Sequence, residues 1–279
     1  MITYLTDLGL SNNVSHESVQ EFLSPDGVLY IVMNRPEVQN AFNSEQIVLL
    51  TEALENVESN PEVKAVVLCG EGKNFCAGGD INYMRRMGQN SFQENKEDAL
   101  QLAHLMHTLN EFPKPTIARV NGAAYGGGVG LLCCCDMAFG TEETKICLSE
   151  VKIGMVPATI GPYVINAIGL RNAHRLMLTA EVMQGQEAVN CNFLNDIFPT
   201  TKFNEKVDAV ALKITTNAPN ALEITKSLLL NLAHQPIDKS VIDYTADVIA
   251  NVRESDEGKE GFTSFLEKRK PSWSTQNSK

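Results

Sequence analysis

The apolar residues in the first part of the chain form short runs separated by glycine, proline and polar residues. Residues 28–34 (VLYIVMN) are rich in β-branched and aromatic side chains and follow the turn signal SPDG, which predicts a strand. From Ser44 the apolar residues recur at helical spacing, and Pro61 ends this segment. Residues 63–69 (VKAVVLC) predict a second strand that is apolar enough to be buried on both faces. The order strand, helix, strand is typical of an α/β fold with a right-handed crossover.

Further along the chain, the apolar pattern predicts one more helix followed by a strand, and after residue 160 it predicts mainly helices. A polar tract at 88–98 is expected to be a mobile loop, and residues 99–111 predict a helix. Strands are expected at 116–120 and within 192–198. The remaining helical patterns cover 129–135, 164–168, 173–178, 207–217, 219–234 and 237–251.

Composition and charge exclude several classes of protein. The chain has 279 residues, of which 43% are hydrophobic and 20% charged, as in an ordinary soluble globular protein. A formal net charge of −11 argues against a broad surface for nucleic acid or anionic membrane, because both need clustered Lys and Arg. No apolar run reaches the ~18 to 20 residues of a membrane span, and the N-terminus does not resemble a secretory signal. We therefore expect a cytoplasmic protein with no nucleic-acid and no membrane partner.

The residues that commonly bind metals are not arranged as a metal site. Seven cysteines occur without a CxxC pair, and the adjacent residues Cys133–Cys135 cannot converge on one zinc ion. Buried free thiols in a reducing compartment are the expected state. His104 and His107 lie three positions apart on a predicted helix, but no third ligand is evident nearby. We expect no metal.

Two glycine-rich segments, each following a predicted strand, are the first candidate chemistry. They are Cys76–Asp80 (CAGGD) and Tyr125–Gly128 (YGGG), and the second precedes an apolar run that can open a helix. One such loop often serves only close packing. Two of them can place two backbone N–H donors around one oxygen, which is the geometry that stabilises an enolate or a tetrahedral oxyanion. Glu150, in the apolar stretch LSEVKIG, is a candidate acid or base with a raised pKa.

These segments belong to a longer series of motifs in the order NRPEVQNAFN, FCAGGDI, VNGAAYGGGVGL, SEVKIGMVP and EGFTSFLEKRKPSW. With this series the chain resembles the enoyl-CoA hydratase/isomerase (crotonase) superfamily over nearly its whole length. The resemblance implies an α/β fold, with a crotonase-like spiral of repeated ββα units in residues 1–203 and a C-terminal helical trimerisation region in residues 204–279. It also implies a homotrimer or homohexamer, an acyl-CoA substrate, and no cofactor beyond the coenzyme A of that substrate.

The resemblance assigns roles to residues of the glycine-rich segments. The backbone amides of Ala77 and Gly127 are expected to form the oxyanion hole for the thioester carbonyl. Asp80 is expected to cap or orient the helix that follows it. The residues expected around coenzyme A in this part of the chain are Val38, Ala77, Gly78, Gly79 and Asp80.

Two further candidate residues lie near the C-terminus, and a third directly precedes the glycines of the second segment. Phe265 and Lys268 match a C-terminal motif that in relatives reaches the coenzyme A phosphates, often from a neighbouring subunit. For Lys268 the alternative is a solvated helix charge. Tyr125 either touches an acyl chain or serves packing alone.

The carboxylates depart from the family pattern. Typical hydratases of the family hold one water between two glutamates. The position of the first glutamate is occupied by Gly130 in this chain, and we expect Gly130 to contact the substrate. The second falls on Glu150, whose alternative role is a structural or surface glutamate. The stretch LSEVKIGMVPATIGPYVINAIG is most similar to hydratases of leucine and acyclic-terpenoid degradation. Hydration of 3-methylglutaconyl-CoA or a similar branched enoyl-CoA is therefore expected. Isomerisation or decarboxylation of an enoyl-CoA, and a non-catalytic binding protein on the same fold, remain as alternatives.

Overall fold

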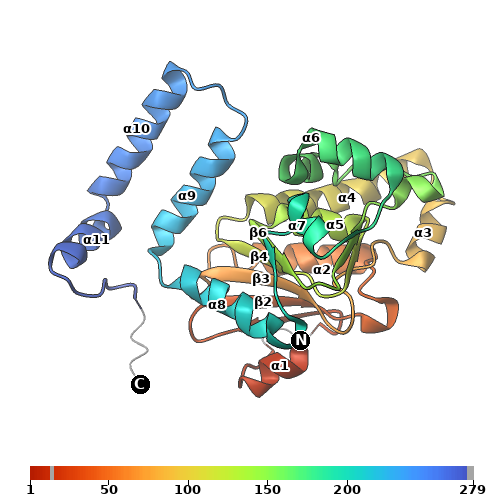
Figure 1. Ribbon diagram of the computed structural model, residues 1–279, viewed down its shortest axis with the longest axis horizontal. Coiled ribbons are helices and arrows are strands. Elements are labelled where there is room, and N and C mark those ends of the chain that lie inside the picture. The colour runs from red at the N-terminus through yellow and green to blue at the C-terminus, as the bar shows by residue number, and fades with distance from the viewer. Residues whose placement is uncertain (13–15, 275–279) are drawn as a thin grey trace.

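A six-stranded sheet forms the centre of the molecule (Figure 1). The structure is a computed structural model that describes residues 1–12 and 16–274. Within the sheet only the pair β1–β2 is antiparallel. The strands, in spatial order, are β1 (Val19–Leu23), β2 (Val28–Met33), β3 (Ala65–Gly70), β4 (Thr116–Arg119), β6 (Met137–Gly140) and β9 (Asp196–Ile197). A second sheet contains β5 (Ala123–Tyr125), β7 (Lys145–Cys147) and β8 (Met183–Gln184).

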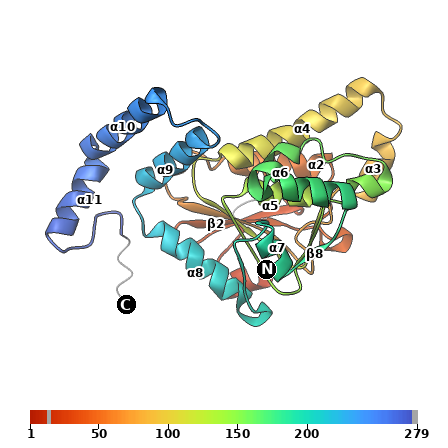
Figure 2. The same ribbon diagram turned by 45° about the horizontal axis from the view of Figure 1, so that its top comes forward.

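Helices cover both faces of the large sheet. The odd-numbered residues of β2, Leu29 to Met33, face one apolar core, and the even-numbered residues, Val28 to Val32, face another. The first core is closed by α2 (Ser44–Glu55), α4 (Phe92–Glu111), α5 (Gly127–Cys134) and α6 (Gly161–Thr179). The second is closed by α1 (Ile2–Asp7) and α8 (Phe203–Thr215), as Figures 1 and 2 show. Burial of both faces explains the nearly continuous apolar runs in the strands, and the α/β fold is confirmed.

The helix α4 is longer than its apolar pattern predicts. The polar tract at 88–98 is not a loop throughout, because α4 begins at Phe92. Ser91 and Glu94 form a capping box, in which the Ser91 hydroxyl accepts from the Glu94 amide at 3.3 Å and the Glu94 carboxylate accepts from the Ser91 amide at 2.7 Å. The expectation of a mobile loop is wrong here, since the first turns of α4 face solvent and need no apolar stripe.

Other helix and strand boundaries differ from those expected from the sequence, because strand pairing or a single glycine determines them. The two helical patterns at 164–168 and 173–178 belong to one element, α6, which Gly169 interrupts with φ 75° and ψ 154°. The strand expected within 192–198 is only Asp196–Ile197, and α5 begins at Gly127 rather than at residue 129. A short helix, α7 (Gln186–Asn190), follows β8.

The C-terminal helices project from the body of the molecule (Figures 1 and 2). They are α9 (Pro219–Leu232), α10 (Lys239–Glu254) and α11 (Asp256–Leu266). By contrast α8 packs on the sheet, with Phe203 and Val207 in the second core. No residue of α10 is buried in the single chain. None of the helices in the described residues is long and apolar enough to cross a membrane.

Candidate active site

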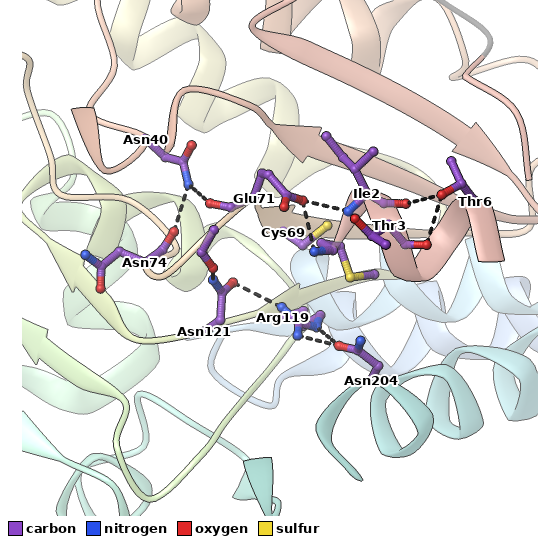
Figure 3. Close-up of polar contacts among 12 residues, drawn as sticks. Ile2, Thr3, Thr6, Asn40, Cys69, Glu71, Asn74, Arg119, Asn121 and Asn204 are labelled. Carbon is purple, nitrogen blue, oxygen red and sulfur yellow. Dashed lines mark hydrogen bonds and ion pairs between the residues drawn. The ribbon is translucent and has the colours of Figure 1, made fainter. Parts of the chain in front are cut away.

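A buried asparagine holds the loop that leads to the first glycine-rich segment (Figure 3). Asn40 is fully buried, and its side-chain amide donates to the carbonyl oxygens of Glu71 at 2.8 Å and Asn74 at 2.7 Å. Its Oδ1 accepts from the Arg35 amide at 2.9 Å. Asn74 in turn accepts from the Ala123 amide at 2.9 Å. These bonds fix the loop after β3 against both the turn after β2 and strand β5.

The segment Cys76–Asp80 runs between β5 and Phe42, which precedes the N-cap residue of α2. On one edge the amide of Tyr125 donates to the Cys76 carbonyl at 2.9 Å. On the other edge the Phe42 amide donates to the Gly78 carbonyl at 2.9 Å, and the Asp80 amide donates to the Phe42 carbonyl at 3.0 Å. The segment is therefore held on both edges, by β5 at Cys76 and by Phe42 at Gly78 and Asp80.

This pairing determines which amide is free to bind a ligand. The Ala77 amide donates to the Gln39 carbonyl at 3.0 Å. It is therefore not a free donor, contrary to the role expected for it in the oxyanion hole. Gly79 pairs with Phe42 through bonds made by its two neighbours, so its own N–H points to the opposite edge. Among the described residues no partner accepts from the Gly79 amide, and sequence reasoning missed it as a donor.

The glycines of the second segment allow close packing and also leave amides unpaired. A Cβ on Gly127 would lie 2.3 Å from Cζ of Phe42, and a Cβ on Gly128 would lie 2.7 Å from the Cys76 carbonyl oxygen. Gly126 has φ 50°, in the region that favours glycine. The Gly126 amide donates to the Cys147 carbonyl and the Val129 amide to the Gly126 carbonyl, whereas no partner among the described residues accepts from the Gly127 amide, which lies at the positive end of the helix dipole.

Glu150 places its carboxylate at this end of α5. It begins the single 3₁₀ turn η2 (Glu150–Ile153), and its Oε1 lies 3.4 Å from the point that a Cβ on Gly126 would occupy. Its Oε2 is buried and has no hydrogen-bond partner among the described residues. Burial raises the pKa of the Glu150 carboxyl above its usual value, as the apolar sequence around it predicts. A carboxyl in this state can both accept and donate a proton.

Gly130 lies one turn further along α5, beneath Ile160. It is buried, and a Cβ on it would lie only 2.3 Å from Cγ2 of Ile160. The structure therefore covers Gly130 with an apolar side chain, in contrast to the expectation that it meets the substrate. Neither the burial of Gly130 nor its contact with Ile160 could be read from the sequence.

Asp80 serves as the cap of α3 (Ile81–Met87). Its Oδ1 accepts from the amides of Asn82 at 2.8 Å and Tyr83 at 3.2 Å, and its Oδ2 pairs with the Arg35 guanidinium at 3.1 Å. Burial alone would raise the pKa of Asp80, but these hydrogen bonds and the ion pair hold it below its usual value. The expected capping role is confirmed, and the carboxylate is already fully used within the chain.

The remaining expected residues lie on a 3₁₀ turn before α2 and at the C-terminal helix α11. Val38 is half-buried in the 3₁₀ turn η1 (Pro36–Val38). Phe265 is 80% exposed on α11, and Lys268 is exposed just beyond it. Figures 1 and 2 both place α11 at the end of the molecule opposite α3. A contact of Phe265 or Lys268 with coenzyme A from a neighbouring subunit stays a prediction.

Potential metal ligands do not converge in the part of the chain that the structure describes. The described residues contain no group of three His, Cys, Asp or Glu side chains arranged for a metal ion. His104 pairs with Glu55 on the surface at 3.1 Å. All seven cysteines are free, and burial raises the thiol pKa of both Cys69 and Cys76 to about 12. Such thiols are unreactive at neutral pH.

Comparison with known proteins identifies the family. Residues 24–276 match the enoyl-CoA hydratase/isomerase family. The crystal structure of an enoyl-CoA hydratase from Shewanella pealeana superposes with a TM-score of 0.89 at 40% identity, covering 92% of this chain and 96% of that one. The chain belongs to the enoyl-CoA hydratase/isomerase family and is an enoyl-CoA hydratase-like enzyme.

Curated relatives with two different activities are about equally similar to this chain. The crotonyl-CoA hydratase of Syntrophomonas wolfei is 31% identical over 245 residues, covering 87% of this chain and 92% of that protein. The peroxisomal Delta(3,5)-Delta(2,4)-dienoyl-CoA isomerase of Arabidopsis thaliana is 29% identical over 258 residues, covering 88% of this chain and 91% of that protein. The choice between hydration and isomerisation therefore rests on the site.

Proposed function

We propose that this enzyme adds water across the 2,3 double bond of an enoyl-CoA. The observation that carries the proposal is the Glu150 carboxylate, which has a buried oxygen without a partner and lies beside the N-terminus of α5. The unpaired amides of Gly79 and Gly127 are the donors that we assign to the thioester carbonyl oxygen. Two such donors stabilise the negative charge that develops on that oxygen, by roughly 3 kcal/mol or more each.

The proton balance needs only one carboxylate. As the water oxygen bonds to Cβ, the electron pair of the double bond moves toward Cα and the thioester oxygen, where the two amides stabilise it. Glu150 accepts a proton from the water and returns a proton to Cα, so it ends in the protonation state in which it began. A raised pKa suits this role, because a group that exchanges protons works best when its pKa is near the ambient pH. Coenzyme A enters with the substrate, and no further cofactor takes part.

For the substrate we favour a branched enoyl-CoA with a second carboxylate, such as 3-methylglutaconyl-CoA. The protein supplies one carboxylate where two usually orient the water, and the free carboxylate of such a substrate can orient it instead. Crotonyl-CoA lacks that group, so its kcat/KM is expected to be lower by about tenfold or more. Steady-state rates on purified protein test this, and equal kcat/KM values for the two substrates would refute the assignment.

Isomerisation is the second candidate, and the single carboxylate favours it directly. Moving a double bond requires one group that carries a proton between Cα and Cγ, with the same stabilisation of the enolate. Reaction in water labelled with ¹⁸O separates the two, since only hydration places the label at Cβ. Decarboxylation is recognised in the same experiment because the product lacks the carbon dioxide lost from the substrate.

Replacement of Glu150 tests the mechanism itself. Glu150→Gln keeps the shape of the side chain but cannot move a proton, so kcat is expected to fall by about a hundredfold or more. Glu142→Gln is the matched control, because Glu142 is an exposed glutamate just after β6, and wild-type rates are expected. If Glu150→Gln retains wild-type turnover on every acyl-CoA tested, the carboxylate is not part of the mechanism. A wild-type protein that binds but converts none of them supports the non-catalytic alternative.

A further inference from the structure

Gly130 is an unfavourable residue in its own helix, and one neighbour accounts for it. Glycine in a helix interior is less stable than alanine, so its presence there needs a reason. A Cβ on Gly130 would lie 2.3 Å from Cγ2 and 2.9 Å from Cβ of Ile160, and 3.1 Å from Cε of Met106. Ile160 is itself only 2% exposed and cannot move aside into solvent. Position 130 therefore accepts no side chain while Ile160 is present.

The covered position lies next to Glu150. Gly126 is the N-cap residue of α5, and Gly130 lies four residues further on, about one turn or roughly 6 Å along the helix axis. The Glu150 carboxylate lies over Gly126, while Ile160 lies over Gly130. A carboxylate carried by residue 130 would emerge about one turn from Glu150, where both could hold one water. Ile160 fills that space with apolar atoms.

We propose that Ile160 is a specificity-determining residue. It fills the space that a second carboxylate would occupy, and so it restricts the enzyme to substrates that carry a free carboxylate themselves. Gly130 and Ile160 are then a matched pair, since a glutamate at 130 fits only when the side chain at 160 is small. This inference rests on the proposed hydration. If Ile160 were only a core residue, its replacement would change stability but leave the relative rates on different enoyl-CoAs unchanged.

A stability cycle tests the steric pairing without reference to activity. Gly130→Ala is expected to lower the Tm by roughly 3 °C or more, although alanine is the better helix former. In the Ile160→Ala background the same substitution is expected to cost little or to raise the Tm, because the nearest atom has been removed. Gly88→Ala is the control, since exposed Gly88 has φ −66° and a Cβ on it would make only ordinary contacts, the nearest at 3.6 Å, so it should not lower the Tm. Additive losses in the cycle overturn the pairing.

Two double variants of equal shape test the effect on specificity. Gly130→Glu with Ile160→Ala restores a second carboxylate, and Gly130→Gln with Ile160→Ala provides the same volume without charge. The ratio of kcat/KM for crotonyl-CoA to that for 3-methylglutaconyl-CoA is expected to be about tenfold or more higher in the Glu variant than in the Gln variant. Equal ratios overturn the proposal. If these variants do not fold, Gly130→Asp and Gly130→Asn in the same Ile160→Ala background repeat the comparison with shorter side chains.

The two arms separate the failure of this inference from the failure of the proposed function. A wild-type enzyme that hydrates no enoyl-CoA rejects the proposed function and the specificity effect together. The stability cycle still decides whether Ile160 excludes a side chain at position 130. Active wild-type enzyme with equal ratios in the Glu and Gln variants rejects only the specificity effect.

Discussion

Two features of the Glu150 carboxylate destabilise the folded chain and are not expected of a glutamate with a purely structural role. One of its oxygens is buried without a hydrogen-bond partner, and burial raises the pKa of the group. A buried acceptor without a partner destabilises the folded state unless a ligand or water completes it. The arrangement is therefore best explained by a partner that arrives with the substrate.

The raised pKa of Glu150 makes the stability of the enzyme depend on pH in a defined direction. Below the usual carboxyl pKa of 4.5 the group is protonated in both the folded and the unfolded chain, and burial has little cost. As pH rises through the interval between 4.5 and the raised folded pKa, the unfolded chain loses its proton first, so stability falls. The amide side chain introduced by Glu150→Gln cannot lose a proton. The Tm of this variant minus the Tm of the wild type should therefore increase as pH rises through this interval. Thermal unfolding between pH 4 and pH 8 measures the gap, and a gap independent of pH contradicts the prediction.

Single residues show where sequence reasoning succeeds and where it stops. The raised pKa of Glu150 follows from its apolar neighbours along the chain, so it is predictable. The choice of Gly79 over Ala77 as the free amide depends on pairing with Phe42, which lies far away in sequence. The loss of a glutamate at position 130 is visible in the sequence, but the side chain that fills the space is not.

Among the elements, α3 depends on one charged cap. Asp80 accepts from two amides of the first turn and pairs with Arg35. Asp80→Ala removes the cap and the carboxylate partner of the Arg35 guanidinium, which keeps only its hydrogen bond to the Ala41 carbonyl, so the free energy of unfolding should fall by at least about 1 kcal/mol. Asp80→Asn keeps a capping oxygen and should lose less. Urea unfolding of the two variants compares them, and equal stability of the Ala and Asn variants would show that the cap contributes nothing.

Long helices and central strands were predictable because their signals are local. The start of α2 at Ser44 and the apolar runs of β2 and β3 are examples. The short strands β5, β7 and β8 consist of two or three residues each, too few for an alternating pattern, and exist only through pairing with one another. The first turns of α4 escaped prediction because they are polar and solvent-exposed, so that only the capping box marks them.

At the scale of the whole molecule, the arm formed by α9, α10 and α11 leaves apolar side chains without cover. The large exposed ones on α10 and α11 are Ile242, Tyr244, Ile249, Phe262, Phe265 and Leu266. An isolated chain rarely exposes so many apolar residues on adjoining helices, so we expect these side chains to be buried between subunits.

We expect the arm to assemble the enzyme into a homotrimer or a dimer of trimers. Light scattering after gel filtration should give a mass of three or six times 30.6 kDa. The same mass over a range of micromolar concentrations would indicate a permanent assembly. A particle of 30.6 kDa under these conditions contradicts the expectation.

The two halves of the proposed site differ in how freely they can change over evolution. The amides of α5 lie on a helix packed so closely that Gly127 has no room for a Cβ against Phe42. Glu150 lies on a surface turn that continues into exposed residues, with Ile153 65% and Val156 69% exposed. Substitutions in this turn disturb few buried contacts, whereas those in α5 disturb many. A descendant of this enzyme can therefore acquire a new reaction by replacing residues of the turn, while the part that binds the thioester stays unchanged.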